Sequence, residues 1–291
     1  VLLFGENING ATRWLNIAGI SFQPSELAKY IIVFFLAMMI EKYGQVKKNW
    51  IVPLIYLGAA GVFSILVFME NNLSIAAIIM FVAFIMVFVS GMNGKETIAL
   101  MGAGGVLGAM GIFSSDYRRE RFMSFTNPWK YANDEGYQLV HSLYAIGSGG
   151  LFGVGLGNSK QKALYMPEPH NDFIFAIIAE ELGLVGCIII MAIFAVLIIA
   201  GIDVAMKAKD KYGKLLAAGI ISVIAVQVII NIAVVTGSMP VTGVPLPFIS
   251  YGGTSLVFNL AAVGVLLNIS RQTKSHKDEI QEKIIKSKMN V

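Results

Sequence analysis

Charged side chains are scarce in this sequence. Asp, Glu, Lys and Arg make up 14% of the 291 residues, whereas hydrophobic residues make up 56%. The mean hydropathy is +0.71. Soluble domains carry about 25% charged residues, so the composition excludes an ordinary soluble domain and indicates a membrane protein.

Cysteine is almost absent. Cys187 is the only one, which excludes a disulfide framework and a cysteine-rich metal site. It lies in an apolar run, where we expect a small, buried, apolar residue. The net charge is only +4, and the basic residues are dispersed between apolar runs, so we expect no nucleic-acid partner.

Long apolar runs dominate what is present. Runs of about 20 apolar residues are typical of membrane-spanning helices. Their Gly and Ala residues allow neighbouring helices to approach closely. The sequence therefore predicts an all-α fold, a polytopic membrane helical bundle with about seven spans, at 25–40, 50–69, 73–91, 97–115, 183–202, 215–236 and 253–270.

The distribution of Lys and Arg predicts the topology. The short segments 70–72 and 237–252 contain neither residue. Because Lys and Arg in short loops stay on the cytoplasmic side of a membrane, we expect the loop 116–172 outside and the C-terminus in the cytoplasm. The segments expected inside carry Lys42, Lys47, Lys48, Lys95, Lys207, Lys209, Lys211, Lys214 and Arg271.

This pattern divides the chain into a polytopic membrane domain, residues 1–270, and a cytoplasmic tail, residues 271–291. The tail mixes both charge signs, and we expect a frayed helix or disorder there. "VLLFG" at the start resembles the last turn of an apolar span, so we expect further residues before Val1. In the outside loop, "GYQLVHSLYAIG" (136–147) is expected to form an amphipathic helix, and the glycines that follow it to allow tight turns or close backbone approach.

Ionisable residues gather at the edge of an apolar run in "YMPEPHNDFIFAIIAEELG" (165–183). We expect a helix to begin near 170–171, with Asn171 as its N-cap and Asp172 in its first turn. An acid there has two interpretations: it stabilises a positive helix end, or it marks a functional site at a membrane boundary. Glu180 and Glu181 are expected to pair with basic residues of a neighbouring helix.

Three long motifs carry a family resemblance. "NGATRWLNIAGISFQPSELAKY" (9–30), "PEPHNDFIFAIIAEELG" (167–183) and "PVTGVPLPFISYGGTSL" (240–256) resemble the SEDS proteins of bacteria, which include FtsW, RodA and SpoVE. The loop motifs are most similar to the FtsW and SpoVE branch. Members of this family have about ten spans, so the resemblance implies that about three are missing from this chain.

The resemblance implies a peptidoglycan glycosyltransferase of the bacterial cytoplasmic membrane, acting in cell division or sporulation. Such enzymes polymerise lipid II, an undecaprenyl-diphosphate-linked disaccharide-pentapeptide, at the outer face. The family's essential aspartate corresponds to Asp172. The remaining motif residues are assigned to substrate binding: Arg13, Lys29, Glu168, His170 and Ser250. The implied partners are lipid II, membrane lipids and a class B penicillin-binding protein with transpeptidase activity.

The chemistry of these residue types suits glycan extension. A carboxylate such as Asp172 can act as general base on the acceptor hydroxyl. Positive charge from Arg13, Lys29 or a divalent cation, Mg or Mn, would stabilise the departing diphosphate. Purely structural interpretations remain for two of these residues: Arg13 belongs to a turn anchored by Trp14, and Lys29 snorkels to the headgroups. Where the family often has "QPDLGT", this chain has "ENNLSI" (70–75), in which Glu70 is a substitute acid.

Two other functional classes stay open. Intramembrane polar groups and broken helices also suit a transporter, here a lipid II flippase. A flippase requires polar groups along its spans, and the main candidates are Gln227, Asn231 and Asn259. The third class is a scaffold that only recruits another cell-wall enzyme.

Overall fold

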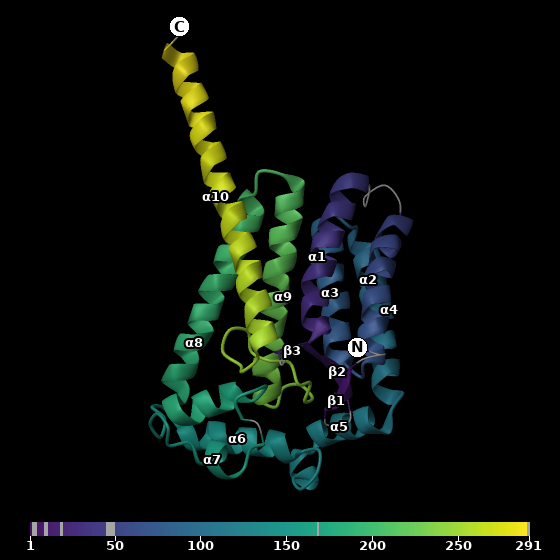
Figure 1. The fold of residues 1–291 in the computed structure, drawn as a ribbon, viewed down its shortest axis with the longest axis vertical. Helices are drawn as coiled ribbons and strands as arrows, with labels where there is room; N and C mark the ends of the chain where they lie inside the picture. Colours follow the sequence, from purple (N-terminus) through teal and green to yellow (C-terminus); the bar gives the residue numbers. More distant parts are fainter. Residues whose placement is uncertain (2–4, 9–10, 18–19, 45–49, 168, 290–291) are drawn as a thin grey trace.

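The computed structural model describes the chain except residues 2–4, 9–10, 18–19, 45–49, 168 and 290–291 (Figure 1). Long helices stand side by side in a bundle, with shorter helices across one end. The long helices are α1 (Pro24–Tyr43), α2 (Ile51–Met69), α3 (Leu73–Val89), α4 (Gly94–Phe113), α8 (Ile174–Lys207), α9 (Lys211–Val235) and α10 (Gly253–Met289). These confirm the predicted helical bundle.

Within the described residues, five helices are long and apolar enough to cross a membrane: α2, α4, α8, α9 and the first part of α10, Gly253–Thr273. The other two predicted spans are also helical. α3 is apolar but has only 17 residues, and α1 carries Glu26 and Lys29 in its first turns. The core lies where α1, α3 and α9 meet, and α9 is the most buried of the five, with 61% of its apolar window inside the bundle.

The region 116–172, which was predicted to be a long loop, contains several short helices. It forms α5 (Asp116–Thr126), the short 3-10 helix η1 (Pro128–Tyr131), α6 (Tyr137–Gly149) and α7 (Lys160–Leu164). These helices lie across one end of the bundle (Figure 1), which we name the loop end; the opposite end is the tail end. The predicted helix over 136–147 is confirmed as α6. The tail is helical as well, because α10 continues through residue 270 to Met289.

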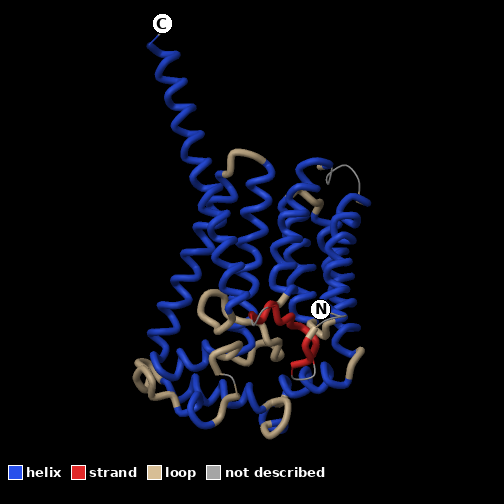
Figure 2. The backbone as a smooth tube through the Cα atoms, viewed as in Figure 1, coloured by secondary structure: helices blue, strands red, loops and turns tan. Residues whose placement is uncertain are grey.

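A small sheet near the N-terminus was missed by the sequence analysis. Strands β1 (Glu6–Ile8), β2 (Ala11–Ile17) and β3 (Ile20–Phe22) pair antiparallel in the order β1-β2-β3, and they lie at the loop end (Figure 2). An Asn-Gly pair at 9–10 joins β1 to β2. Asn-Gly is a strong hairpin signal, and it was the cue available in the sequence.

Helix α8 is longer than the predicted span and is broken. The predicted apolar span covered residues 183–202, whereas α8 covers Ile174–Lys207. Gly183 has φ 67° and ψ −166°, values that are not helical, so it kinks the helix. Glu180 and Glu181 precede this kink, and their charge hid the first part of the helix from a hydropathy pattern.

The glycine-rich segment after α6 fills the break in α8. Gly149 and Gly153 lie against the backbone of α8, where a Cβ would overlap the carbonyl oxygens of Ala179 and Glu181. Four backbone hydrogen bonds join the two segments, so the peptide groups freed by the kink are satisfied. The bonds are Val154 N–H to Glu180 O (2.9 Å), Gly155 N–H to Glu181 O (3.1 Å), Leu184 N–H to Gly150 O (3.0 Å) and Val185 N–H to Leu151 O (3.1 Å). The predicted close backbone approach of the glycines is confirmed.

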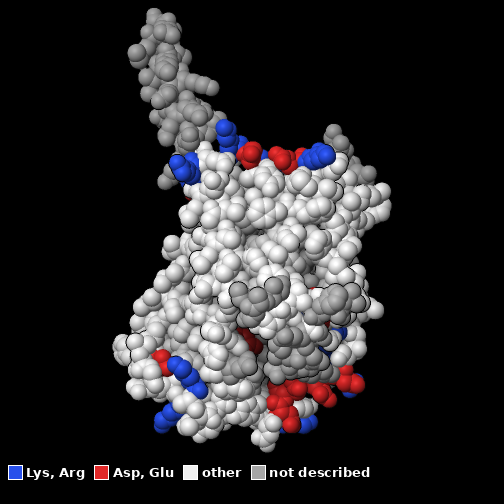
Figure 3. Space-filling model, in the orientation of Figure 1, with Lys and Arg blue, Asp and Glu red and all other residues white. Residues whose placement is uncertain are grey.

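Charged side chains on this face gather at the two ends of the bundle, and the middle is uncharged (Figure 3). This is the distribution expected of a protein whose middle lies in hydrocarbon. Helix α8 presents Ile188, Ile193 and Val196 on its exposed surface. The chain is therefore a multi-pass membrane protein.

The close packing at Gly149 leads to a test with a matched control. We expect Gly149→Ala to destabilise the protein by about 1–3 kcal/mol, because the added methyl group has no space against α8. Gly147 lies in the same helix, and a Cβ there meets nothing within 4 Å. We expect Gly147→Ala to leave stability unchanged or to raise it by about 0.5–1 kcal/mol through helix propensity. Heating the detergent-purified variants and measuring the folded fraction by gel filtration checks both; equal midpoints would contradict the packing described here.

Candidate active site

The backbone of residues 170–172 is held by the chain between α9 and α10. Its three successive carbonyl oxygens each accept a hydrogen bond. Tyr251 N–H donates to His170 O (2.8 Å), Ser250 Oγ donates to Asn171 O (2.6 Å), and Asn231 Nδ2 donates to Asp172 O (2.7 Å). Such bonds fix the position of Asp172 without involving its carboxylate.

The Asp172 carboxylate lies beside Gly243, since a Cβ built on this glycine would be 3.7 Å from Asp172 Oδ2. Gly243 has φ 69°, in a segment without regular secondary structure between α9 and α10. A side chain at Gly243 would therefore be strained and would crowd the carboxylate. Irregular backbone at this depth normally lines a cavity, and Figure 3 shows acidic atoms within a recess on this face.

The helix after Asp172 starts later than predicted. Residues 171–173 form a turn, and α8 begins at Ile174 with Phe173 in the N-cap position. The predicted N-cap role of Asn171 is therefore wrong, because Asn171 lies two residues before the N-cap; its backbone carbonyl is bound by Ser250. Asp172 is half-buried just before the helix, and the interpretation as an acid within the first helical turn does not apply.

Ser250 acts on two backbone segments at once. Its hydroxyl donates to Asn171 O and accepts a hydrogen bond from Leu246 N–H (2.7 Å). His170 is exposed, and its ring meets that of Tyr251 edge to face, with centroids 5.3 Å apart. Ser250 and His170 therefore lie beside Asp172. Their predicted contact with the substrate stays a prediction.

Asn231 is a site residue whose role the sequence did not reveal. This α9 side chain is 1% exposed, and its Nδ2 donates both to Asp172 O and to Val244 O (2.8 Å). Asn231 thereby joins the backbone at Asp172 to the segment that contains Gly243. Its position as one of two amides in an apolar span, with Gln227, was visible in the sequence, but its two partners lie 59 and 13 residues away.

Arg13 lies in β2 and holds the turn between α2 and α3. Its Nη2 donates to Asn71 O (2.5 Å), and its Nε donates to Glu70 O (3.4 Å). Burial raises the pKa of the neighbouring Glu70 carboxyl above its usual value, and the Arg13 guanidinium opposes this shift. The arginine thus has a structural role at this turn, and diphosphate binding stays a prediction.

We name Asp172 and the residues that hold or face it, Asn231, Gly243, Ser250 and Tyr251, the Asp172 cluster. The α2–α3 turn is joined to this cluster. Ser74, in the first turn of α3, donates its hydroxyl to Thr242 O (2.8 Å), and Thr242 precedes the glycine that faces Asp172. On the other side, Thr254 at the start of α10 donates to Ser21 O of β3 (3.0 Å). The N-terminal sheet, the start of α3 and the start of α10 therefore surround the same part of the loop end.

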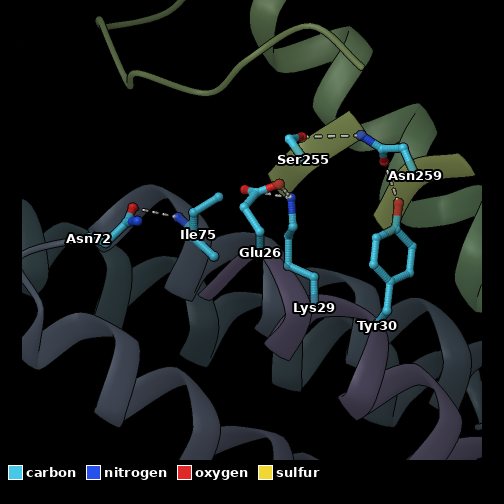
Figure 4. Close-up of polar contacts among 7 residues, drawn as sticks. All are labelled: Glu26, Lys29, Tyr30, Asn72, Ile75, Ser255 and Asn259. Atoms are coloured by element: carbon cyan, nitrogen blue, oxygen red, sulfur yellow. Dashed lines mark hydrogen bonds and ion pairs between the residues drawn. The ribbon is translucent and has the colours of Figure 1, made fainter. Parts of the chain in front are cut away.

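Lys29 is buried in an ion pair. Its Nζ lies 2.9 Å from both Oε1 and Oε2 of Glu26, and the two residues are 1% and 3% exposed. The pair points toward the first turns of α10, where Ser255 and Asn259 lie (Figure 4). The snorkelling interpretation of Lys29 is wrong, because its ammonium is held inside the bundle by Glu26.

The two acids that precede the kink in α8 have different kinds of partner. Glu180 accepts from the Ser159 hydroxyl (2.5 Å) and from the backbone N–H groups of Lys160 (3.1 Å) and Gln161 (3.3 Å). The predicted pairing of Glu180 with a basic residue of a neighbouring helix is therefore wrong; its carboxylate instead fixes the start of α7. Glu181 lies 4.0 Å from Lys162 of the neighbouring helix α7, so its predicted pairing is confirmed.

A protein-built metal site is not evident in the part of the chain that the structure describes, since no three His, Cys, Asp or Glu side chains gather there. Glu168 lies outside the described residues, so its predicted role cannot be placed. A divalent cation therefore stays a prediction. Mg²⁺ commonly binds through one or two carboxylates together with substrate phosphates, and Asp172 fits that arrangement.

A comparison with protein families gives a match over nearly the whole chain. The sequence model of the cell cycle proteins FtsW, RodA and SpoVE matches residues 1–275. The chain belongs to the FtsW, RodA and SpoVE family. This confirms the resemblance drawn from the three sequence motifs.

Individual relatives of this family agree. The chain is 44% identical over 271 residues to stage V sporulation protein E of Bacillus subtilis, covering 91% of this chain and 73% of that protein. It is 40% identical over 272 residues to a probable peptidoglycan glycosyltransferase FtsW of Geobacter sulfurreducens, covering 93% and 73%. Its fold matches a chain of a solved peptidoglycan synthase complex, described as coordinating polymerization and crosslinking, with a TM-score of 0.78 at 27% identity, covering 94% and 77%.

The buried ion pair between Glu26 and Lys29 allows a test of the role of Lys29 in this member of the FtsW, RodA and SpoVE family. We expect Lys29→Met to cost about 3–5 kcal/mol of stability, because Glu26 is left charged and unpaired inside the bundle. The double variant Glu26→Gln, Lys29→Met removes both charges and is expected to regain most of that loss. Thermal stability in detergent and glycan synthesis are measured for both variants. Recovery of stability without activity supports a substrate role for Lys29, whereas recovery of both assigns it to structure alone.

Proposed function

We propose that this protein is a peptidoglycan glycosyltransferase that polymerises lipid II, with Asp172 as the general base. The observation that carries the proposal is the tethered backbone of residues 170–172. All three carbonyl oxygens are bound, so the Asp172 carboxylate is presented beside Gly243 at a fixed place. A catalytic base must be held near its proton donor in this way.

The reaction joins an acceptor sugar hydroxyl to the anomeric carbon of the donor. Asp172 takes the proton of that hydroxyl while the bond from the anomeric carbon to the lipid diphosphate breaks. Positive charge at the departing diphosphate lowers the barrier. Arg13 lies beside the α2–α3 turn, which is joined to the Asp172 cluster through Ser74 and Thr242. The guanidinium, or a divalent cation bound with the diphosphate, supplies that charge.

Two observations support polymerisation over a flippase. Two of the three interior amides, Asn231 and Asn259, hold structural hydrogen bonds to the backbone, to Tyr30 and to Ser255, which leaves Gln227 as the remaining candidate for a polar path. The relatives include proteins named as probable peptidoglycan glycosyltransferases. The solved complex that the fold matches coordinates polymerization and crosslinking, which supports a transpeptidase of the class B penicillin-binding proteins as partner.

The decisive variant is Asp172→Asn. It keeps the size and the backbone hydrogen bonds of the residue but removes the base, so we expect lipid II polymerisation to fall at least about a hundredfold. Asp172→Glu is expected to retain more activity because it retains a carboxylate. Polymerisation of labelled lipid II is measured with the transpeptidase partner present, at equal membrane levels of each variant.

Asn171→Ala is the matched control, because Asn171 contributes its backbone carbonyl to Ser250, and that carbonyl survives the change. We expect polymerisation within a fewfold of the unmodified protein. Near-normal polymer from Asp172→Asn would overturn the assignment of the base.

The proposed site requires that the loop end faces the outside. The basic residues Lys207, Lys209, Lys211 and Lys214 lie around the α8–α9 connection at the tail end, which supports a cytoplasmic tail end. We expect Asn158→Cys, exposed at the loop end, to react with a membrane-impermeant thiol reagent in intact cells. Lys209→Cys, exposed at the tail end, is expected to react only after permeabilisation. Cys187→Ala supplies the unlabelled background, and the reverse pattern would place the site inside.

A further inference from the structure

A continuous group of aromatic rings lies at the loop end, apart from the Asp172 cluster. It is formed by Trp129 of η1, Tyr137, His141 and Tyr144 of α6, and Tyr165 just after α7; we name these five residues the aromatic platform. Neither the proton transfer nor the binding of the diphosphate uses them.

His141 lies at the centre of the platform. Its ring stacks on that of Tyr165, with centroids 5.2 Å apart and planes 10° apart. The Tyr137 ring approaches it to 4.3 Å, and the Tyr144 ring meets it edge to face at 5.9 Å. Trp129 extends the row, 5.4 Å from Tyr144. The rings thus support one another and form one surface.

Three of these rings remain open to ligands. Trp129 is 55% exposed, Tyr144 is 50% exposed and Tyr165 is 47% exposed. Large rings are usually buried when a protein folds. A contiguous group left exposed marks an interaction site more often than single exposed rings do.

Polar bonds beneath the rings fix the platform. The Tyr137 hydroxyl donates to Tyr165 O (2.8 Å), and His141 Nδ1 lies 2.7 Å from Gln161 Oε1. Gln161 belongs to α7, whose start is held by the buried Glu180 carboxylate. A surface fixed in this way loses little conformational entropy when a ligand binds.

The platform is joined directly to the proposed active site. Tyr165 and Asp172 are seven positions apart in the sequence, so the two lie at most about 25 Å apart even if that segment is fully extended. The first part of this connecting segment is anchored by the buried Met166, and its last part is anchored by the hydrogen-bonded carbonyl groups of residues 170–172. A chain of sugars that leaves Asp172 can therefore reach the platform within a few sugar units.

We propose that the aromatic platform binds the growing glycan strand as it leaves the active site. Pyranose rings present faces of C–H groups that pack on aromatic rings, while their hydroxyl groups bind polar side chains at the edge of such a surface. The platform offers both, because its exposed rings are uncharged, Tyr144 and Tyr165 carry hydroxyl groups, and Gln161 is bonded to the central His141. This inference rests on the proposed function for the identity of the strand, and it adds a second binding site for the product.

A membrane surface and a protein partner also bind exposed aromatic residues. The glycan is favoured here because the platform is continuous with the segment that carries Asp172. A headgroup anchor would not need the rings to be locked to that segment. The two other occupants become outcomes of the test.

The experiment compares Trp129→Ala, Tyr144→Ala and Tyr165→Ala with the unmodified protein. Two quantities are measured: the initial rate of lipid II consumption and the length distribution of the strands. We expect the initial rate to stay within about twofold and the strands to shorten, because a strand that is held less firmly dissociates earlier. Trp129→Phe and Tyr165→Phe keep an aromatic face and are expected to restore strand length. Phe152→Ala, a residue 80% exposed in the segment after α6, is the matched control and should change neither quantity.

A binding measurement separates the platform from catalysis. Purified, uncrosslinked glycan strands are titrated onto Asp172→Asn protein in detergent, with and without each alanine change. We expect the affinity to fall about fivefold or more for each ring, as is common for central interface rings. If the unmodified protein makes no polymer, the proposed function fails, and the titration still reports on the platform. Unchanged strand length together with unchanged strand affinity would overturn the inference. Loss of membrane insertion or of transpeptidase binding, with strand affinity intact, would assign the rings to those occupants instead.

Discussion

Three backbone carbonyl oxygens in a row, those of His170, Asn171 and Asp172, are the constraint on which the proposed site depends. Their donors come from α9 and from the irregular segment that follows it. A peptide group in an apolar bundle must find a partner inside the protein, so this short stretch cannot move without breaking several bonds together. The rigidity of the site therefore comes from the backbone, which fixes where the carboxylate is presented.

The same requirement for partners inside the protein applies to the buried polar side chains. Glu26 and Lys29 bind each other, Glu180 holds the start of α7, and Asn231 joins two loop segments. Each of these groups is costly to bury alone. They all lie toward the loop end, where the bundle meets the folded helices α5 to α7. These buried polar groups thus belong to the loop end, whereas exposed charged side chains lie at both ends of the bundle (Figure 3).

Sequence reasoning worked where one physical rule dominates. Apolar length predicted the helices, and glycine clustering predicted close backbone contact near Gly149 and Gly153. It failed where a group chooses among distant partners: Asn171 was expected to cap a helix but lies before the N-cap, and the snorkelling interpretation of Lys29 gives way to its ion pair with Glu26. The motif that contains Asp172 identified the candidate site, whereas Asn231 was named only as a polar group that a flippase would need, because its hydrogen-bond partners are brought to it only by the fold.

The break in α8 also matters for how the chain is assembled. Residues 149–155 precede α8 in the sequence, and their peptide groups complete the hydrogen bonding of a helix that is synthesised after them. The part of α8 before Gly183 reaches its final backbone bonding only when the glycine segment already stands at the loop end. Placement of that segment and completion of the helix therefore depend on each other, because without the segment the peptide groups on either side of Gly183 would lack their hydrogen-bond partners.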